Sequence, residues 1–143
     1  MNAKRLTRAF FHSMGVYDVV LGLIFALFFR EIYQALQIEL PNHSGYIFVP
    51  AWFLISGGIG EFFVARRPLR NVDLVIVRTL MKVSFVGAVA YCYVRYGIPM
   101  IYVLISMISS VGIAGNLVFL KWAKSAGPAA DGTSKGGIDA ERL

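Results

Sequence analysis

Charge and cysteine are both scarce in this chain. Only 15% of its 143 residues are charged, whereas about a quarter of an ordinary soluble domain is. Hydrophobic residues make up 57%, which is more apolar surface than one small core can cover. The single cysteine, Cys92, excludes an internal disulfide. These absences argue against a soluble domain, a disulfide-stapled domain and a disordered or collagen-like chain.

Long apolar runs take the place of charge. Four stretches approach or exceed the roughly 20 residues that a helix needs to cross a bilayer, at residues 9–29, 46–65, 74–96 and 99–122. Backbone groups in lipid must form hydrogen bonds within their own segment, which favours helices. A β-barrel would need strands in which apolar and polar residues alternate, and the sequence shows no such alternation. With short connections, the sequence predicts an all-α fold, an integral membrane four-helix up-down bundle over residues 1–124.

Basic residues predict the orientation of this bundle. Most of the Lys and Arg residues near helix ends fall on one side: Lys4, Arg5, Arg8, Arg66, Arg67, Arg70, Lys121 and Lys124. Only Arg30 and Arg95 fall on the other side. The positive-inside rule therefore places both termini in the cytoplasm. The net charge of +6 then mostly reflects the orientation in the membrane. The sequence has no basic stripe with interleaved aromatic residues outside the spans, so we expect no nucleic-acid partner.

Two segments outside the spans have their own character. The stretch REIYQALQIEL in the first connection fits a short interfacial helix or an irregular loop, and the sequence leaves both open. Residues 125–143 are rich in Gly, Ala and small polar residues without apolar periodicity. We predict that this tail is disordered and cytoplasmic.

Ionisable residues inside the spans are the most informative feature. Asp18 and Lys82 lie at a depth of ~12 Å from the cytoplasmic end, at ~1.5 Å per residue. Glu61 and Arg78 lie at ~6 Å and Asn116 at ~9 Å, so all five form one intramembrane polar layer. Since each buried charge needs a partner, we predict two pairs, Lys82 with Asp18 and Arg78 with Glu61.

The role of this polar layer has two interpretations. The ion pairs can simply fix the register of the helices. Alternatively, they can form a polar site for a ligand, a lipid head group, an ion or a proton. Gly22, Gly57 and Gly112 each lie four residues from a polar member of the layer, so small residues line the same helix faces.

Metal and cofactor sites find no support in the sequence. The two histidines, His12 and His43, are predicted on opposite sides of the membrane and cannot ligate one haem together. No cluster of Cys, His and carboxylates has the spacing of a zinc site. We therefore predict no metal, no cofactor and no catalytic residue.

Three stretches resemble the DoxX-like group of small four-helix bacterial membrane proteins. They are YDVVLGLIFALF with an acid before Gly22, YIFVPAWFLISGGIGEFFVARRPLRN, and VRTLMKVSF with a basic residue early in the third helix. The fourth helix departs from the pattern, since Asn116 in GIAGN stands where many relatives have an acid. The resemblance implies a four-helix bundle in the bacterial inner membrane, sometimes associated with membrane redox systems.

These observations lead to two expected functions. The first is a non-catalytic membrane protein, an accessory or structural subunit that packs against a larger membrane complex or forms a homo-oligomer. The alternative is a small-molecule or proton-coupled transporter with a buried polar site in the cytoplasmic half. A quinone-linked redox subunit or other enzyme is a weaker third interpretation, since no catalytic constellation is visible.

Overall fold

The computed structural model describes residues 3–126. Its elements, in chain order, are α1 (Ala3–Ala35), α2 (Gly45–Arg66), the 3-10 turn η1 (Pro68–Arg70), α3 (Val72–Tyr96) and α4 (Met100–Ala126). The predicted all-α class with four helices is confirmed, because the described part of the chain contains helices and no strand.

The first helix is longer than the predicted span. It runs through Ala35, with non-helical backbone angles at Phe28 (φ −123°, ψ 21°). The first part of the REIYQALQIEL stretch is therefore helical, as one of the two alternatives predicts, and it follows a kink at Phe28. Its position at a membrane interface stays a prediction. A hydrogen bond from the Ile38 amide to the Tyr33 carbonyl (2.8 Å) then reverses the chain, and Gln37 takes a positive φ of 53°.

The connection between α3 and α4 is short because glycine ends the third helix. Gly97 has φ +67° and ψ +62°, a left-handed conformation that glycine adopts without the penalty of a Cβ atom. Pro99 immediately precedes α4, where its missing N–H group costs little, as the sequence predicts. At the other end, α4 includes Ser125 and Ala126, and the rest of the predicted tail lies outside the described residues.

Three of the described helices are long and apolar enough to cross a membrane: α1, α2 and α4. The chain is therefore consistent with an integral membrane protein. The 25-residue α3, which the sequence predicts as a fourth span, is not among the three. It carries two buried basic residues, Arg78 and Lys82, which must be neutralised by partners if the helix is to lie in lipid.

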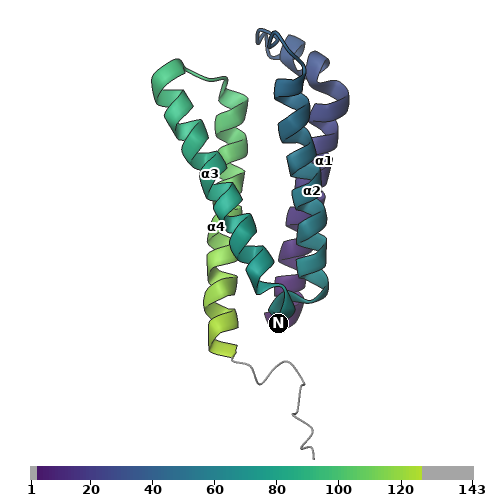
Figure 1. Cartoon of the computed structure of the whole chain (residues 1–143), viewed down its shortest axis with the longest axis vertical. Coiled ribbons are helices and arrows are strands. Elements are labelled where there is room, and N and C mark those ends of the chain that lie inside the picture. The colour runs from purple at the N-terminus through teal and green to yellow at the C-terminus, as the bar shows by residue number, and fades with distance from the viewer. Residues whose placement is uncertain (1–2, 127–143) are drawn as a thin grey trace, which may run out of the picture.

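The helices associate as two pairs, α1 with α2 and α3 with α4 (Figure 1). Small residues allow the close approach of α1 and α2. A Cβ atom on Gly58 would lie 2.7 Å from the Gly15 carbonyl oxygen, and one on Gly22 would lie 2.7 Å from the Ala51 carbonyl oxygen. In contrast, α3 begins beside α2 and then runs obliquely away from it (Figure 1). Small residues thus hold α1 against α2 along their length, whereas α3 meets α2 mainly through its first half.

Two apolar clusters lie at opposite ends of the bundle. The first contains Phe11, Val64, Val75 and Phe119, one from each helix, together with Ala65. The second joins α1 and α2 near the start of α2, with Ile101 and Ile105 of α4 packed against it: Phe25, Tyr33, Ile47 and Ala51. In the sequences of α1, α2 and α4, the polar residues predicted as an intramembrane layer lie between these two clusters, and in α3 they follow Val75 of the first cluster.

Candidate functional site

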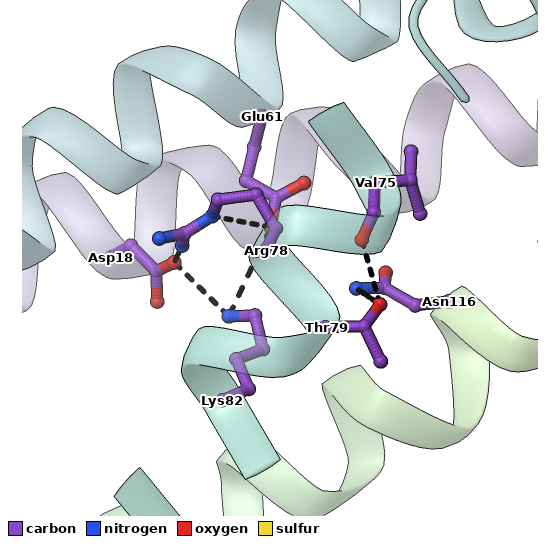
Figure 2. A network of polar contacts seen from close by, with 7 residues as sticks. All are labelled: Asp18, Glu61, Val75, Arg78, Thr79, Lys82 and Asn116. Atoms are coloured by element: carbon purple, nitrogen blue, oxygen red, sulfur yellow. Dashed lines mark hydrogen bonds and ion pairs between the residues drawn. The ribbon is translucent and has the colours of Figure 1, made fainter. Parts of the chain in front are cut away.

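Four charged side chains from three helices meet inside the bundle (Figure 2). Asp18 comes from α1, Glu61 from α2, and Arg78 and Lys82 from one face of α3. All four are buried, with exposed fractions between 0% for Glu61 and 8% for Lys82. We call these four residues the ionic cluster. Its formal charge is zero, so the bundle encloses charges of both signs without a net excess.

Each cation of the ionic cluster contacts both carboxylates. Arg78 Nη2 donates to Asp18 Oδ2 at 2.5 Å, and Arg78 Nε donates to Glu61 Oε1 at 3.4 Å. Lys82 Nζ donates to Asp18 Oδ2 at 3.1 Å and lies 3.9 Å from Glu61 Oε1. Both predicted pairs are present, but the cross-contacts turn two separate pairs into one network (Figure 2).

Glycines make room for the long basic side chains. A Cβ atom on Gly57 would overlap the Arg78 guanidinium group, so only glycine lets that group lie against α2. A Cβ atom on Gly112 would lie 3.4 Å from Lys82 Cδ, which places the lysine stem against α4. Gly22 instead serves the contact of α1 with Ala51 and Ile55 of α2. Two of the three glycines singled out in the sequence therefore shape the ionic cluster itself.

Asn116 is buried but belongs to a different part of the polar layer. Its Nδ2 atom donates to Thr79 Oγ1 at 3.0 Å, and the Thr79 hydroxyl donates to the Val75 carbonyl at 2.7 Å. These residues lie on the side of α3 that faces α4, away from the ionic cluster (Figure 2). The expected layer is thus divided by α3 into a charged part and a neutral part. The neutral part joins α3 to α4.

An apolar cavity of about 280 Å³ ends at the ionic cluster. Asp18, Arg78 and Lys82 contribute to its lining, and the other lining residues are mostly apolar side chains from all four helices. Tyr46 and Phe53, which also line it, are 69% and 60% exposed, so the cavity opens to the surroundings of the bundle. A concave, mainly apolar pocket with a few convergent polar groups has the character of a small-molecule site.

The opposite side of the ionic cluster is closed. The apolar cluster of Phe11, Val64, Val75 and Phe119 lies between the ionic cluster and the end where α1 begins, and none of these residues is more than 4% exposed. A molecule entering the cavity would therefore reach the charges from one side only.

A second polar contact lies beside the cavity and joins α1 to α4. The hydroxyl groups of Tyr33 and Tyr102 are 2.5 Å apart, and Tyr102 also lines the cavity. In the sequence, Tyr102 is recognisable only as an interfacial aromatic residue. Its partner comes from the part of α1 that extends beyond the predicted span, so the pair has no signal in the pattern of apolar runs.

Thr79 and the cavity are the other features that sequence reasoning misses. A threonine inside a helix commonly bonds to the carbonyl four residues earlier, so its type and position give no hint of a partner on α4. The cavity depends on the oblique path of α3, which no local pattern encodes. The charged residues, in contrast, are conspicuous because their burial in an apolar span is costly.

Comparisons with known proteins return no match: no family model, no curated protein and no solved structure is similar to this chain.

Proposed function

We propose that the chain crosses the membrane four times as an up-down bundle, with both termini in the cytoplasm of a bacterium. The asymmetry of the basic residues supports this orientation, since eight lie at one end and only Arg30 and Arg95 at the other. The ionic cluster supports the fourth crossing, because its carboxylates neutralise the two cations of α3. The assignment to the DoxX-like group is also a proposal, which rests on the three quoted motifs.

Within this membrane protein, we propose a carrier for a small amphipathic molecule. The observation that carries the proposal is the cavity of about 280 Å³ with apolar walls and the ionic cluster at its base. It is open on one side and sealed by buried apolar residues on the other, as expected for one state of a carrier that works by alternating access. The two helix pairs are the natural bodies to move against each other.

The charges at the base of the cavity indicate the chemistry of the ligand. Two cations and one anion reach the cavity, namely Arg78, Lys82 and Asp18, while Glu61 is not part of its lining. A carboxylate at the end of an apolar chain would find donors at the base and apolar side chains around its body. We therefore propose an amphipathic anion of the medium-chain carboxylate type as the ligand.

The cavity is also the reason to prefer a carrier over an accessory subunit. The accessory role is inferred from missing catalytic motifs and from exposed apolar surface. Apolar surface is expected on any helix that faces lipid, and so does not single out a protein partner. The cavity gives the chain a binding site of its own, lined by every helix of the bundle.

Photolabelling tests the proposed ligand. The full chain is reconstituted in liposomes with a ten-carbon carboxylate that carries a diazirine, and the labelled residues are mapped by mass spectrometry. We expect saturable labelling of cavity residues such as Leu54 and Phe85, and competition by unlabelled decanoate but not by decylamine.

Two tryptophan variants of α4 provide the matched control. Ser109→Trp fills the cavity, whereas Val111→Trp changes a residue that is 64% exposed and outside the lining. Labelling of cavity residues should disappear only in Ser109→Trp. Equal labelling of both variants, or equal competition by the amine, would show that the probe reports the lipid surface and would contradict the proposal.

Cysteine accessibility tests the orientation. After Cys92→Ser removes the only cysteine, Gln37→Cys and Lys124→Cys place single thiols at opposite ends of the bundle. In intact cells, a membrane-impermeant maleimide should label the thiol at position 37 and reach the one at position 124 only after permeabilisation. The reverse pattern, or labelling of both, would contradict the proposed topology.

A further inference from the structure

A second cavity lies at the end of the bundle where α1 begins and α4 ends. Its volume is about 200 Å³, and its lining comes from α1, the end of α2, η1 and α4. Basic side chains dominate this lining: Lys4, Arg8, Arg66, Arg67 and Arg70. Among the residues that the structure describes, no acidic one lines it, so this cavity carries an excess of positive charge, unlike the neutral ionic cluster.

Four of the five basic side chains of this cavity have no counter-charge among the described residues. Within residues 3–126, no ion pair is formed by Lys4, Arg8, Arg66 or Arg67. The ion pairs of Arg78 and Lys82 lie inside the bundle, in the ionic cluster. Like charges gathered around one hollow repel each other, and a bound anion relieves this repulsion. The positive-inside rule explains basic residues at this end, but it does not require them to converge on a cavity from separate elements.

We propose that this second cavity binds a phosphate group. The planar guanidinium groups of Arg8, Arg66 and Arg67 match the geometry of phosphate oxygens and can donate paired hydrogen bonds to them. Thr7 adds a hydroxyl donor to the lining, and Leu69 and Trp122 provide apolar surface beside the charges. This combination suits the head group of an anionic phospholipid, whose phosphate lies at the depth of helix ends, and the same chemistry fits a soluble phosphate.

The proposal is independent of the carrier function. It involves the opposite end of the bundle and shares no lining residue with the cavity above the ionic cluster. If phosphate binding is absent while the decanoate probe labels the first cavity, only this inference is overturned. If the decanoate probe does not label that cavity while phosphate binding is present, only the carrier proposal is overturned.

Native mass spectrometry of the full chain, released from phosphatidylcholine nanodiscs that contain phosphatidylglycerol, tests the inference. The parent should retain one phosphatidylglycerol with saturable affinity, and Arg66→Gln/Arg67→Gln should weaken it about tenfold or more, because two charge-assisted donors are lost. The matched control, Lys121→Gln/Lys124→Gln, removes the same charge from the same end but outside the cavity. It should bind as the parent does, and equal weakening of both variants would overturn the inference in favour of diffuse surface charge.

A second arm distinguishes lipid from soluble phosphate. In nanodiscs of phosphatidylcholine alone, ³¹P line broadening of inorganic phosphate that depends on Arg66 and Arg67 would support a site for soluble phosphate. Absence of saturable binding in both arms would overturn the inference.

If the glutamine variant does not fold, Arg66→Lys/Arg67→Lys takes its place, since lysine keeps the charge but loses the planar fork. Binding several-fold weaker than the parent supports the site, and unchanged binding contradicts it.

Discussion

Asp18→Asn removes the carboxylate that lies closest to both cations of the ionic cluster. Asp18 Oδ2 is 2.5 Å from Arg78 Nη2 and 3.1 Å from Lys82 Nζ, while Glu61 Oε1 is 3.4 Å and 3.9 Å from the same two side chains. Coulomb's law at these four distances gives Asp18 about 1.3 times the attraction of Glu61 for the two cations. The variant leaves two buried cations facing one carboxylate.

The expected cost of this change is large. Removing one partner of a buried ion pair costs about 3–5 kcal/mol, because the remaining charge stays in a low-dielectric environment. We expect Asp18→Asn to fall in this range and Glu61→Gln to cost less, in keeping with its longer contacts. Lys82→Met should also destabilise the bundle, since it leaves the carboxylates in excess.

A double-mutant cycle isolates the interaction. The free energy of unfolding is measured by titration with sodium dodecyl sulfate in mixed micelles, followed by helical circular dichroism. Asp18→Asn/Lys82→Met restores the charge balance with Arg78 and Glu61, and we expect it to recover about 0.5–3 kcal/mol relative to the sum of the single variants. The Asn116→Leu variant, which lies on the other side of α3, provides a control that should not couple to Asp18.

Additive effects would refute this reasoning. If the double variant loses the sum of the two single losses within about 0.5 kcal/mol, Asp18 and Lys82 do not stabilise each other. The cluster would then not be the device that neutralises α3 inside the bundle. A coupling of similar size between Asp18 and Asn116 would point to a general packing defect instead of an ionic interaction.

Two further predictions concern helix contacts, and both use the same unfolding titration. Gly58→Ala should cost about 1–3 kcal/mol of stability, because its Cβ atom would lie 2.7 Å from the Gly15 carbonyl oxygen. The control Gly87→Ala, whose Cβ atom would have nothing within 4 Å, should be neutral or stabilising. Equal effects of the two substitutions would contradict the close approach of α1 and α2. Tyr102→Phe should cost about 0.5–1.5 kcal/mol through loss of its hydroxyl contact with Tyr33, and no change in stability would show that this contact does not form.

The sequence predicts those features that depend on local chemistry. Apolar runs locate the helices, and Pro99 anticipates the start of α4. The burial of charge in apolar segments identifies the members of the ionic cluster, since an unpaired charge there is too costly to be incidental. The spacing of Arg78 and Lys82 also predicts that they share a helix face, which the contacts with Asp18 confirm.

The features that the sequence does not predict depend on the relative placement of helices. The division of the polar layer by α3 follows from which face of that helix meets α4, and Thr79 becomes a partner of Asn116 only in that arrangement. Both cavities combine residues from several elements whose angles are set by packing. The sequence leaves residues 30–35 open between helix and loop, because charged Arg30 and Glu31 end the apolar run, whereas the helical structure continues through Ala35.

The distance between a bound carboxylate and Lys82 decides whether the cavity binds an amphipathic anion. Solid-state NMR of the full chain in lipid bilayers, with ¹⁵N-labelled lysine side chains and decanoate ¹³C-labelled at its carboxyl carbon, reports this distance through dipolar coupling. We expect a coupling that corresponds to a carboxylate oxygen within about 4 Å of Lys82 Nζ. This coupling should be lost in Ser109→Trp and retained in Val111→Trp. A coupling that is absent in the parent, or unchanged by Ser109→Trp, would contradict the proposal that the cavity above the ionic cluster binds an amphipathic anion.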